Sequence, residues 1–166
     1  MARERREHRV ALEILYATDI GKVSRDDAMR QAREGSGVFA RSDAALEADP
    51  YEPIYPAMDR RADAPRPTDW ELVERLVDGS LEHTPELEAQ IGPLLHRWKL
   101  ERLSGIDRLI LIMAAWEIRY RADVDTAAII NHAIELARRF STEQSGQFVN
   151  AVLDALAKTP PVTRSG

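Results

Sequence analysis

The chain has 166 residues, 44% of them apolar and 31% charged, which is the composition of one globular domain. It contains no cysteine, which excludes disulfides, thiolate zinc sites and cysteine nucleophiles. Because the net charge of −5 repels polyphosphate at long range, any nucleic-acid site must be local. No apolar run reaches about 18 residues and no secretory signal pattern opens the chain, so we expect a cytoplasmic protein that does not enter a membrane.

Apolar residues recur at helical spacing from the N-terminus onward. The spacing predicts a first helix over residues 3–20, ending near Gly21 in a left-handed cap, and a second helix over 24–34. Residues 36–67 lose this periodicity and are rich in proline and acids, so we interpret them as a flexible insertion.

Capping pairs mark where helices begin again after the insertion. Thr68 and Glu71 have the spacing of a capping box, and Thr84 precedes a proline at a first helical position. The helix that begins there continues its apolar pattern to Trp98, with a kink expected at Gly92-Pro93.

Ser104 and Asp107 form a further capping pair, and the segment that follows, Leu109–Trp116, is apolar on every side. Such a segment must be covered by other helices, which we expect over 126–139 and 142–157. The sequence thus predicts one all-α domain over 1–166, a compact bundle of about seven helices in two small subdomains with no sheet. A short disordered tail is expected at 159–166.

The first helix carries an arginine cluster. Arg5, Arg6 and Arg9 fall on one side of it, and Arg3 and His8 lie beside them. Arginine suits phosphate because its planar fork donates two hydrogen bonds and stacks on unpaired bases. Cations at a helix start oppose the macrodipole, so the cluster favours an anionic ligand. The alternative is a solvated helix start in which Glu4 and Glu7 pair with the arginines.

Two further groups of residues are candidates for binding. Leu12, Tyr16 and Ile20 continue the arginine face as a second apolar stripe, which serves either a protein partner or packing under another element of the same chain. Gln144 and Gln147 near the start of the last helix carry amides that read base edges. Ser141 and Gln144 also have capping-box spacing, which would occupy Gln144 at the helix start.

Catalysis finds little support in the sequence. The four histidines, at positions 8, 83, 96 and 132, lie on four different predicted elements without the spacing of metal ligands. No glycine-rich loop sits between a strand and a helix, as a nucleotide site would require. We therefore expect no enzyme, no metal and no cofactor.

Four segments together resemble a known family. They are RRxxRxxALxxLY-like spacing at 5–16, WKLERLSGIDRLILIMAAWEI at 98–118, INHAIELARRF at 130–140 and QFVNAVLD at 147–154. In order and separation they are similar to the transcription antitermination factor NusB family, which is linked to ribosomal RNA synthesis. The resemblance implies binding of single-stranded boxA RNA, a heterodimer with the ribosomal protein NusE, and an indirect link to other Nus factors and RNA polymerase.

The resemblance also assigns roles to residues of this chain. It implies RNA contacts at Arg5, Arg6 and His8 and at Gln144, Gln147 and Phe148, and contacts with the protein partner at Tyr16, Ile20 and Asp107. Three positions depart from the family pattern: His8 and Ile112 each replace an arginine and His132 replaces a glutamate. The insertion at 36–67 is longer than the family norm.

Two other classes of function compete with an RNA-binding adaptor. One is a homodimeric structural or regulatory module that uses the second apolar stripe for self-association and binds no RNA in its free state. The other is an enzyme, since the same fold is appended to some RNA cytosine methyltransferases. The chain leaves no room for a cofactor-binding α/β domain, so we expect no methyltransferase activity.

Overall fold

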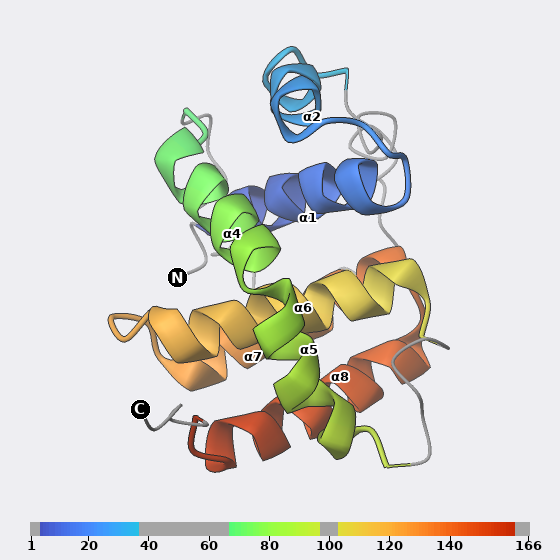
Figure 1. Ribbon diagram of the computed structural model, residues 1–166, viewed down its shortest axis with the longest axis vertical. Helices are drawn as coiled ribbons and strands as arrows, with labels where there is room; N and C mark the ends of the chain where they lie inside the picture. Colours follow the sequence, from blue (N-terminus) through green and yellow to red (C-terminus); the bar gives the residue numbers. More distant parts are fainter. Residues whose placement is uncertain (1–3, 37–66, 97–102, 162–166) are drawn as a thin grey trace, which may run out of the picture. The chain divides into compact units, whose positions relative to one another are not determined.

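The computed structural model describes residues 4–36, 67–96 and 103–161 (Figure 1). These ranges contain seven α-helices and one 3₁₀ turn and no strand, which confirms the predicted all-α class. Arg3, Trp98, nearly all of the predicted insertion and residues 162–166 of the predicted tail lie outside the described residues. The helices are α1 (Arg5–Asp19), α2 (Arg25–Arg33), α4 (Trp70–Glu82), α5 (Thr84–Ile91), α6 (Gly105–Tyr120), α7 (Thr126–Phe140) and α8 (Glu143–Lys158), with the 3₁₀ turn η3 (Gly92–Leu94) after α5.

The chain divides into two compact units, Met1–Val73 and Glu74–Gly166, with the boundary inside α4. In unit 1, α1 packs against α2. Ser24 caps α2 by accepting a hydrogen bond from the Asp27 amide at 3.1 Å, as the predicted start implies. The guanidinium of Arg33, in the last turn of α2, lies 4.8 Å from the ring centre of Trp70, so a cation–π contact joins α2 to the start of α4.

The end of α1 differs from the expected glycine cap. The left-handed residue is Lys22, with φ of 55°, rather than Gly21. Gly21 is required for another reason: a Cβ atom there would lie 2.8 Å from the Ala17 carbonyl oxygen. The turn therefore uses glycine for its small size and not for a left-handed backbone.

The start of α4 also corrects the sequence prediction. Asp69, not Thr68, caps the helix by accepting a hydrogen bond from the Leu72 amide at 3.1 Å. The Asp69 amide donates to the Glu7 carboxylate of α1 at 2.9 Å, whereas Glu71 is exposed. Glu7 is only 1% exposed. Glu7, 62 positions before Asp69 in the chain, thus accepts the N-cap amide, which is the role that the predicted capping box gave to Glu71.

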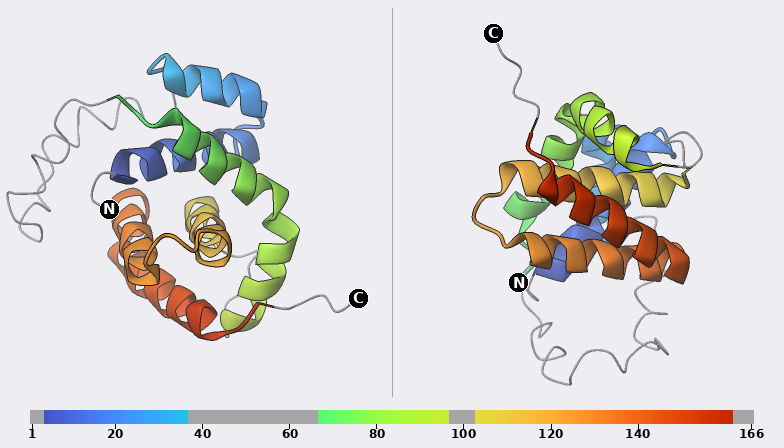
Figure 2. Two further views of the ribbon diagram at one scale, coloured as in Figure 1. Left: turned by 90° about the vertical axis from the view of Figure 1, so that its left-hand side faces the viewer. Right: turned by 90° about the horizontal axis from the view of Figure 1, so that it is seen from below.

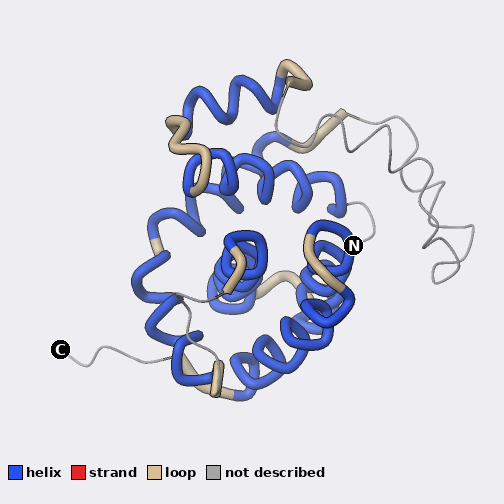
Figure 3. The backbone as a smooth tube through the Cα atoms, turned by 90° about the vertical axis from the view of Figure 1, so that its right-hand side faces the viewer, coloured by secondary structure: helices blue, strands red, loops and turns tan. Residues whose placement is uncertain are grey.

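Unit 2 is arranged around α6, which contacts α5, α7 and α8. Figure 2 shows α6 end-on with these helices around it, and the tube of Figure 3 shows the same arrangement from the opposite side. Every residue of Leu109–Trp116 is buried, as predicted. Gly79 of α4 lies against the Trp116 indole, where a Cβ atom has no room. The buried apolar side chains that α7 and α8 contribute are Ile129, Ile130, Ala133, Leu136, Ala137, Val149, Val152, Leu153 and Leu156.

Three helix boundaries in unit 2 decide what surrounds the core. Ser104 caps α6 as predicted, with its hydroxyl 3.1 Å from the Asp107 amide. Thr84 does not cap α5, because its hydroxyl donates to the Ser80 carbonyl at 2.6 Å. At Gly92-Pro93, where a kink was expected, the α-helix ends: α5 stops at Ile91 and the chain makes η3, while the apolar pattern continues to the buried Leu95. Within the described ranges, no helix is both long and apolar enough to cross a membrane.

Candidate nucleic-acid interface

The predicted arginine cluster occupies the first two turns of α1. Arg5, Arg6 and Arg9 are all half-buried, so each keeps part of its surface open to solvent. The N-cap residue Glu4 makes no side-chain capping hydrogen bond, and the acid of the first turn, Glu7, is turned inward to the Asp69 amide. Three arginines therefore stand near the positive end of a helix whose buried first-turn acid accepts the Asp69 amide at the start of α4.

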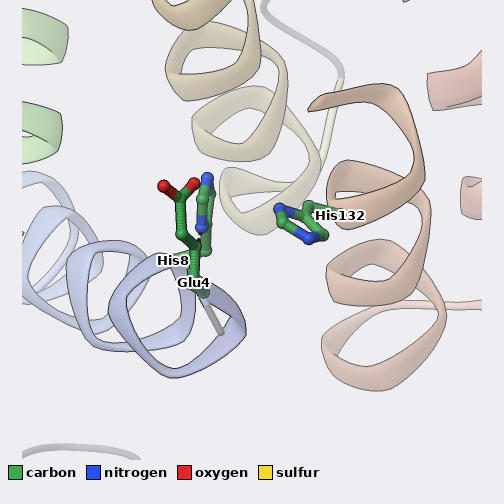
Figure 4. Close-up of side chains that lie close together, drawn as sticks. All are labelled: Glu4, His8 and His132. Carbon is green, nitrogen blue, oxygen red and sulfur yellow. Dashed lines mark hydrogen bonds between the residues drawn. The ribbon is translucent and has the colours of Figure 1, made fainter. Parts of the chain in front are cut away.

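His8 lies between these arginines in the sequence but not on the surface. Its side chain is 2% exposed, and its Nδ1 donates to the Glu4 carbonyl oxygen at 2.7 Å. Figure 4 shows the His8 ring beside Glu4 at the beginning of α1. Because a phosphate reaches such a ring only after the side chain turns outward, we assign His8 to the helix start rather than to the RNA surface.

The predicted partner face on α1 is only partly at the surface. Leu12 is fully buried, so it belongs to the core and is corrected from a partner contact to a packing residue. Tyr16 is half-buried, and Ile20, the C-cap residue, is 48% exposed. The alternative of internal packing thus holds for Leu12, whereas Tyr16 and Ile20 leave an apolar edge at the end of α1.

The amides predicted to read RNA lie at the start of α8. Gln144 and Gln147 are exposed, and Phe148 is half-buried. The expected capping box of Ser141 and Gln144 is wrong, because Thr142 caps the helix by accepting the Ser145 amide at 3.0 Å. Gln144 is therefore not required as the capping partner of Ser141.

Asp107 is buried at the contact between α6 and α8. Its side chain is 8% exposed, and its Oδ2 accepts a hydrogen bond from the Ser145 hydroxyl at 3.0 Å. Asp107 therefore makes an internal contact between α6 and α8, and its role in binding the protein partner stays a prediction. Sequence reasoning missed Ser145, because a serine in a helix of small and polar residues gives no signal of burial.

A further basic residue near Gln144 and Gln147 is Arg138, at the end of α7. A Cβ atom added to Gly146 would lie 3.0 Å from the Arg138 Cγ and 3.2 Å from its Nε, so the Arg138 side chain lies over the first turn of α8. The sequence offered one signal for this contact, the glycine within a helix, since glycine there often allows a close approach. The exposed Arg138 adds positive charge beside the two amides.

The two other departures from the family pattern are internal. Ile112 is buried on α6, and His132 is 7% exposed on α7 (Figure 4). An apolar residue at 112 fits the all-round burial of α6, where a charged side chain would need a partner.

The end of α6 carries the groups with shifted pKa values. Tyr120 stacks on His83 at 4.4 Å between ring centres, and its hydroxyl donates to the Glu86 carboxylate at 2.9 Å. Desolvation and then the hydrogen bond to Glu86 raise the pKa of Tyr120. Arg119 donates to the Gln90 side chain at 2.7 Å and to the Thr159 carbonyl at 2.9 Å, and desolvation lowers its pKa. Glu82 and Glu86 are exposed acids in the same part of the chain as His83, and their negative charge would repel a phosphate.

The NusB family model matches residues 5–158, which is nearly the whole chain. The chain belongs to the NusB family. A transcription antitermination protein NusB of Desulforamulus reducens is 30% identical over 152 residues, which cover 92% of this chain and 87% of that protein. The NusB of Methylacidiphilum infernorum is 41% identical over 90 residues, a match that spans 54% of this chain and 63% of that protein.

A solved structure of the same family has the same fold. The complex of antitermination factors NusB and NusE with double-stranded RNA contains a chain that matches with a TM-score of 0.69 and 18% identity, covering 95% of this chain and 98% of that one. At that identity the likeness shows the fold. In this chain, the arginines of α1 and the amides of α8 both lie on helices of that shared fold.

Proposed function

We propose that this protein is a non-enzymatic transcription antitermination and ribosomal RNA synthesis factor that binds single-stranded boxA-type RNA together with the ribosomal protein NusE. The observation that carries the proposal is the α1 start, where Arg5, Arg6 and Arg9 remain at the surface while Glu7 is turned inward to cap α4. Relatives that share most of this chain are named transcription antitermination proteins, and a chain of the same fold was solved with NusE and RNA.

The two groups of polar residues serve different parts of RNA binding. The arginines of α1 hold phosphates, which supplies affinity without reading sequence. The exposed amides of Gln144 and Gln147 donate and accept hydrogen bonds at base edges, which supplies selectivity. Each surface alone binds weakly, and NusE adds affinity because RNA held by one subunit meets the other at high effective concentration.

The protein partner docks on the end of α1. Ile20 is a large apolar side chain with about half of its surface exposed, and the half-buried Tyr16 lies one turn before it. A contact at this edge serves NusE, which links the complex to other Nus factors and RNA polymerase. Replacement of Ile20 by glutamate is expected to weaken NusE binding without changing RNA binding by the free protein, as measured by titration calorimetry and fluorescence anisotropy.

Fluorescence anisotropy with a short boxA RNA and a scrambled control tests the proposal directly. It is run at two salt concentrations, with and without NusE, and beside a mass measurement of the free protein. We expect preference for boxA, strengthened by NusE. Equal affinity for both RNAs with NusE present would overturn the proposal, and a stable dimer that binds neither RNA would favour a homodimeric regulatory module.

A further inference from the structure

Two capping motifs in unit 2 are bonded to each other. Ser104 caps α6 and Thr142 caps α8, and the third helical residue is Asp107 in the first case and Ser145 in the second. In a capping box this third side chain turns back to its own N-cap amide. Here the Ser145 hydroxyl donates to the Asp107 carboxylate at 3.0 Å, although the two residues are 38 positions apart.

The hydrogen bonds at this junction have one consistent direction. The single hydroxyl proton of Ser145 goes to Asp107, because an ionised carboxylate only accepts. The hydroxyls of Ser141, at 3.0 Å, and Thr142, at 2.9 Å, must then donate to the Ser145 oxygen. That oxygen has two lone pairs and is fully used. The Asp107 carboxylate therefore orders three hydroxyls of the α7–α8 turn through one contact.

The junction between Asp107 and Ser145 is buried. Asp107 and Ser145 are both 8% exposed, and Oδ1 of Asp107 is a buried atom that accepts no hydrogen bond within the described part of the chain. The Ser145 hydroxyl is thus the donor on which the carboxylate depends. Asp107 belongs to the first turn of α6 and accepts a hydrogen bond from the first turn of α8, so its side chain lies beside the N-terminal ends of both helices.

The residues held by this junction are the ones that face solvent around it. Gln144 precedes Ser145 directly, and Gln147 follows it by two positions; both are exposed. We propose that Asp107 is a positioning residue: through Ser145 it holds the first turn of α8 so that the amides of Gln144 and Gln147 meet base edges in fixed orientation. The inference rests on the proposed function and names the residue behind its sequence selectivity.

The test compares Asp107→Ala, Asp107→Asn and Ser145→Ala with the unaltered protein, using boxA and scrambled RNA. We expect the ratio of the two affinities to fall about tenfold in Asp107→Ala and Ser145→Ala, the effect of losing about one base-reading contact. The Asn variant keeps an acceptor for the Ser145 hydroxyl and should restore most of the ratio. Combining the Asp107 and Ser145 changes to alanine should lower it no further, because they break the same link.

Selectivity separates positioning from loss of fold. Destabilisation removes active protein for both RNAs alike and leaves their affinity ratio unchanged, whereas a misplaced turn lowers the ratio at an unchanged salt dependence. Asp154→Ala is the matched control, since Asp154 is an exposed acid on α8 paired with Lys158 at 2.9 Å. An unchanged ratio in Asp107→Ala, or loss of NusE binding alone, would overturn the inference.

Hydrogen exchange provides a readout that does not depend on RNA. Amides of residues 143–148 should exchange faster in Asp107→Ala than in Asp154→Ala, while α6 beyond its first turn stays protected. If the unaltered protein fails to distinguish the RNAs, the proposed function fails, and faster exchange would still establish that Asp107 holds the turn. Unchanged exchange would refute the positioning role itself.

Discussion

The starts of α1 and α8, the two helix ends that we propose contact RNA, are built in different ways. The first two turns of α1 have three arginines, the helix has no side-chain cap, and its buried first-turn acid Glu7 accepts the Asp69 amide at the start of α4. The first turn of α8 has a threonine cap, three linked hydroxyls and a buried carboxylate behind them. Long arginines reach phosphates from many backbone positions, whereas short amides that read bases need a fixed backbone. In the proposed function, affinity therefore depends on the charge at the start of α1, and selectivity depends on the order at the start of α8.

Removing the charge from α1 should give the largest effect. Replacing Arg5, Arg6 and Arg9 with glutamine should lower the affinity for boxA RNA and for scrambled RNA by the same factor, roughly a hundredfold. This factor corresponds to a loss of about 1 kcal/mol of binding free energy for each charged contact removed. The slope of log affinity against log salt should become shallower by about 2, which anisotropy at several salt concentrations measures.

The control for this variant removes the same charge elsewhere. Arg25, Arg30 and Arg75 replaced with glutamine lower the net charge equally, but the first two make surface ion pairs on α2 and Arg75 is exposed on α4. Their loss should change affinity by less than about threefold. Equal losses in the two triple variants would mean that net charge, and not the α1 cluster, drives binding.

The next largest effect should be on stability, at Glu7. Glu7→Ala leaves the Asp69 amide without its acceptor, so the free energy of unfolding in urea should fall by about 1–3 kcal/mol. RNA affinity of the folded protein should not fall, because the α1 arginines are retained. Glu71→Ala, at the exposed position that the sequence favours as the capping partner, should change stability by less than about 0.5 kcal/mol.

A larger loss of stability in Glu71→Ala than in Glu7→Ala would support the capping box of Thr68 and Glu71 that the sequence predicts. The hydrogen bond from the Asp69 amide to Glu7 would then contribute little to the free energy of unfolding in solution. The contrast between α1 and α8 would then lose its structural basis, since the start of α4 would not depend on Glu7.

A smaller effect is expected at Gly146, where the start of α8 is closely packed. Alanine favours a helix over glycine by about 1 kcal/mol, but a Cβ atom here displaces the Arg138 side chain. Gly146→Ala should therefore change the free energy of unfolding by less than about 0.5 kcal/mol, whereas adding Arg138→Ala should recover most of the helix gain. Urea unfolding of the single and double variants checks both. A full gain in the single variant would show that Arg138 does not lie over Gly146 in solution.

The smallest effect should be at Tyr120, away from both helix starts. Its raised pKa means that the folded state holds the phenol proton more tightly than the unfolded state does, so the added stability is present below about pH 10 and lost as pH rises through the raised value. Tyr120→Phe should flatten the fall in unfolding free energy between about pH 9 and pH 12. Its RNA affinity near neutral pH should match the unaltered protein, and a loss there would add the end of α6 to the interface.

The sequence by itself determined the helices and the core. Apolar spacing predicted the all-α class and the all-round burial of Leu109–Trp116, and the caps at Ser24 and Ser104 are confirmed. These features depend on neighbours within one or two turns, which the sequence displays directly. The same spacing placed Arg5, Arg6 and Arg9 together on one helix.

Tertiary structure decided the features that depend on a distant partner. Adjacent polar residues have nearly equal preferences for the N-cap position, so the sequence does not decide between Thr68 and Asp69 or between Ser141 and Thr142. Asp69 and Thr142 are the caps in the structure, and the contact from Glu7 to Asp69 is one that the local sequence does not reveal. Tertiary packing likewise buries Leu12 and Asp107, although the helical pattern allowed a surface position for Leu12 and the family resemblance implied one for Asp107. A local pattern states which side chains share a face, whereas what covers that face depends on residues far along the chain.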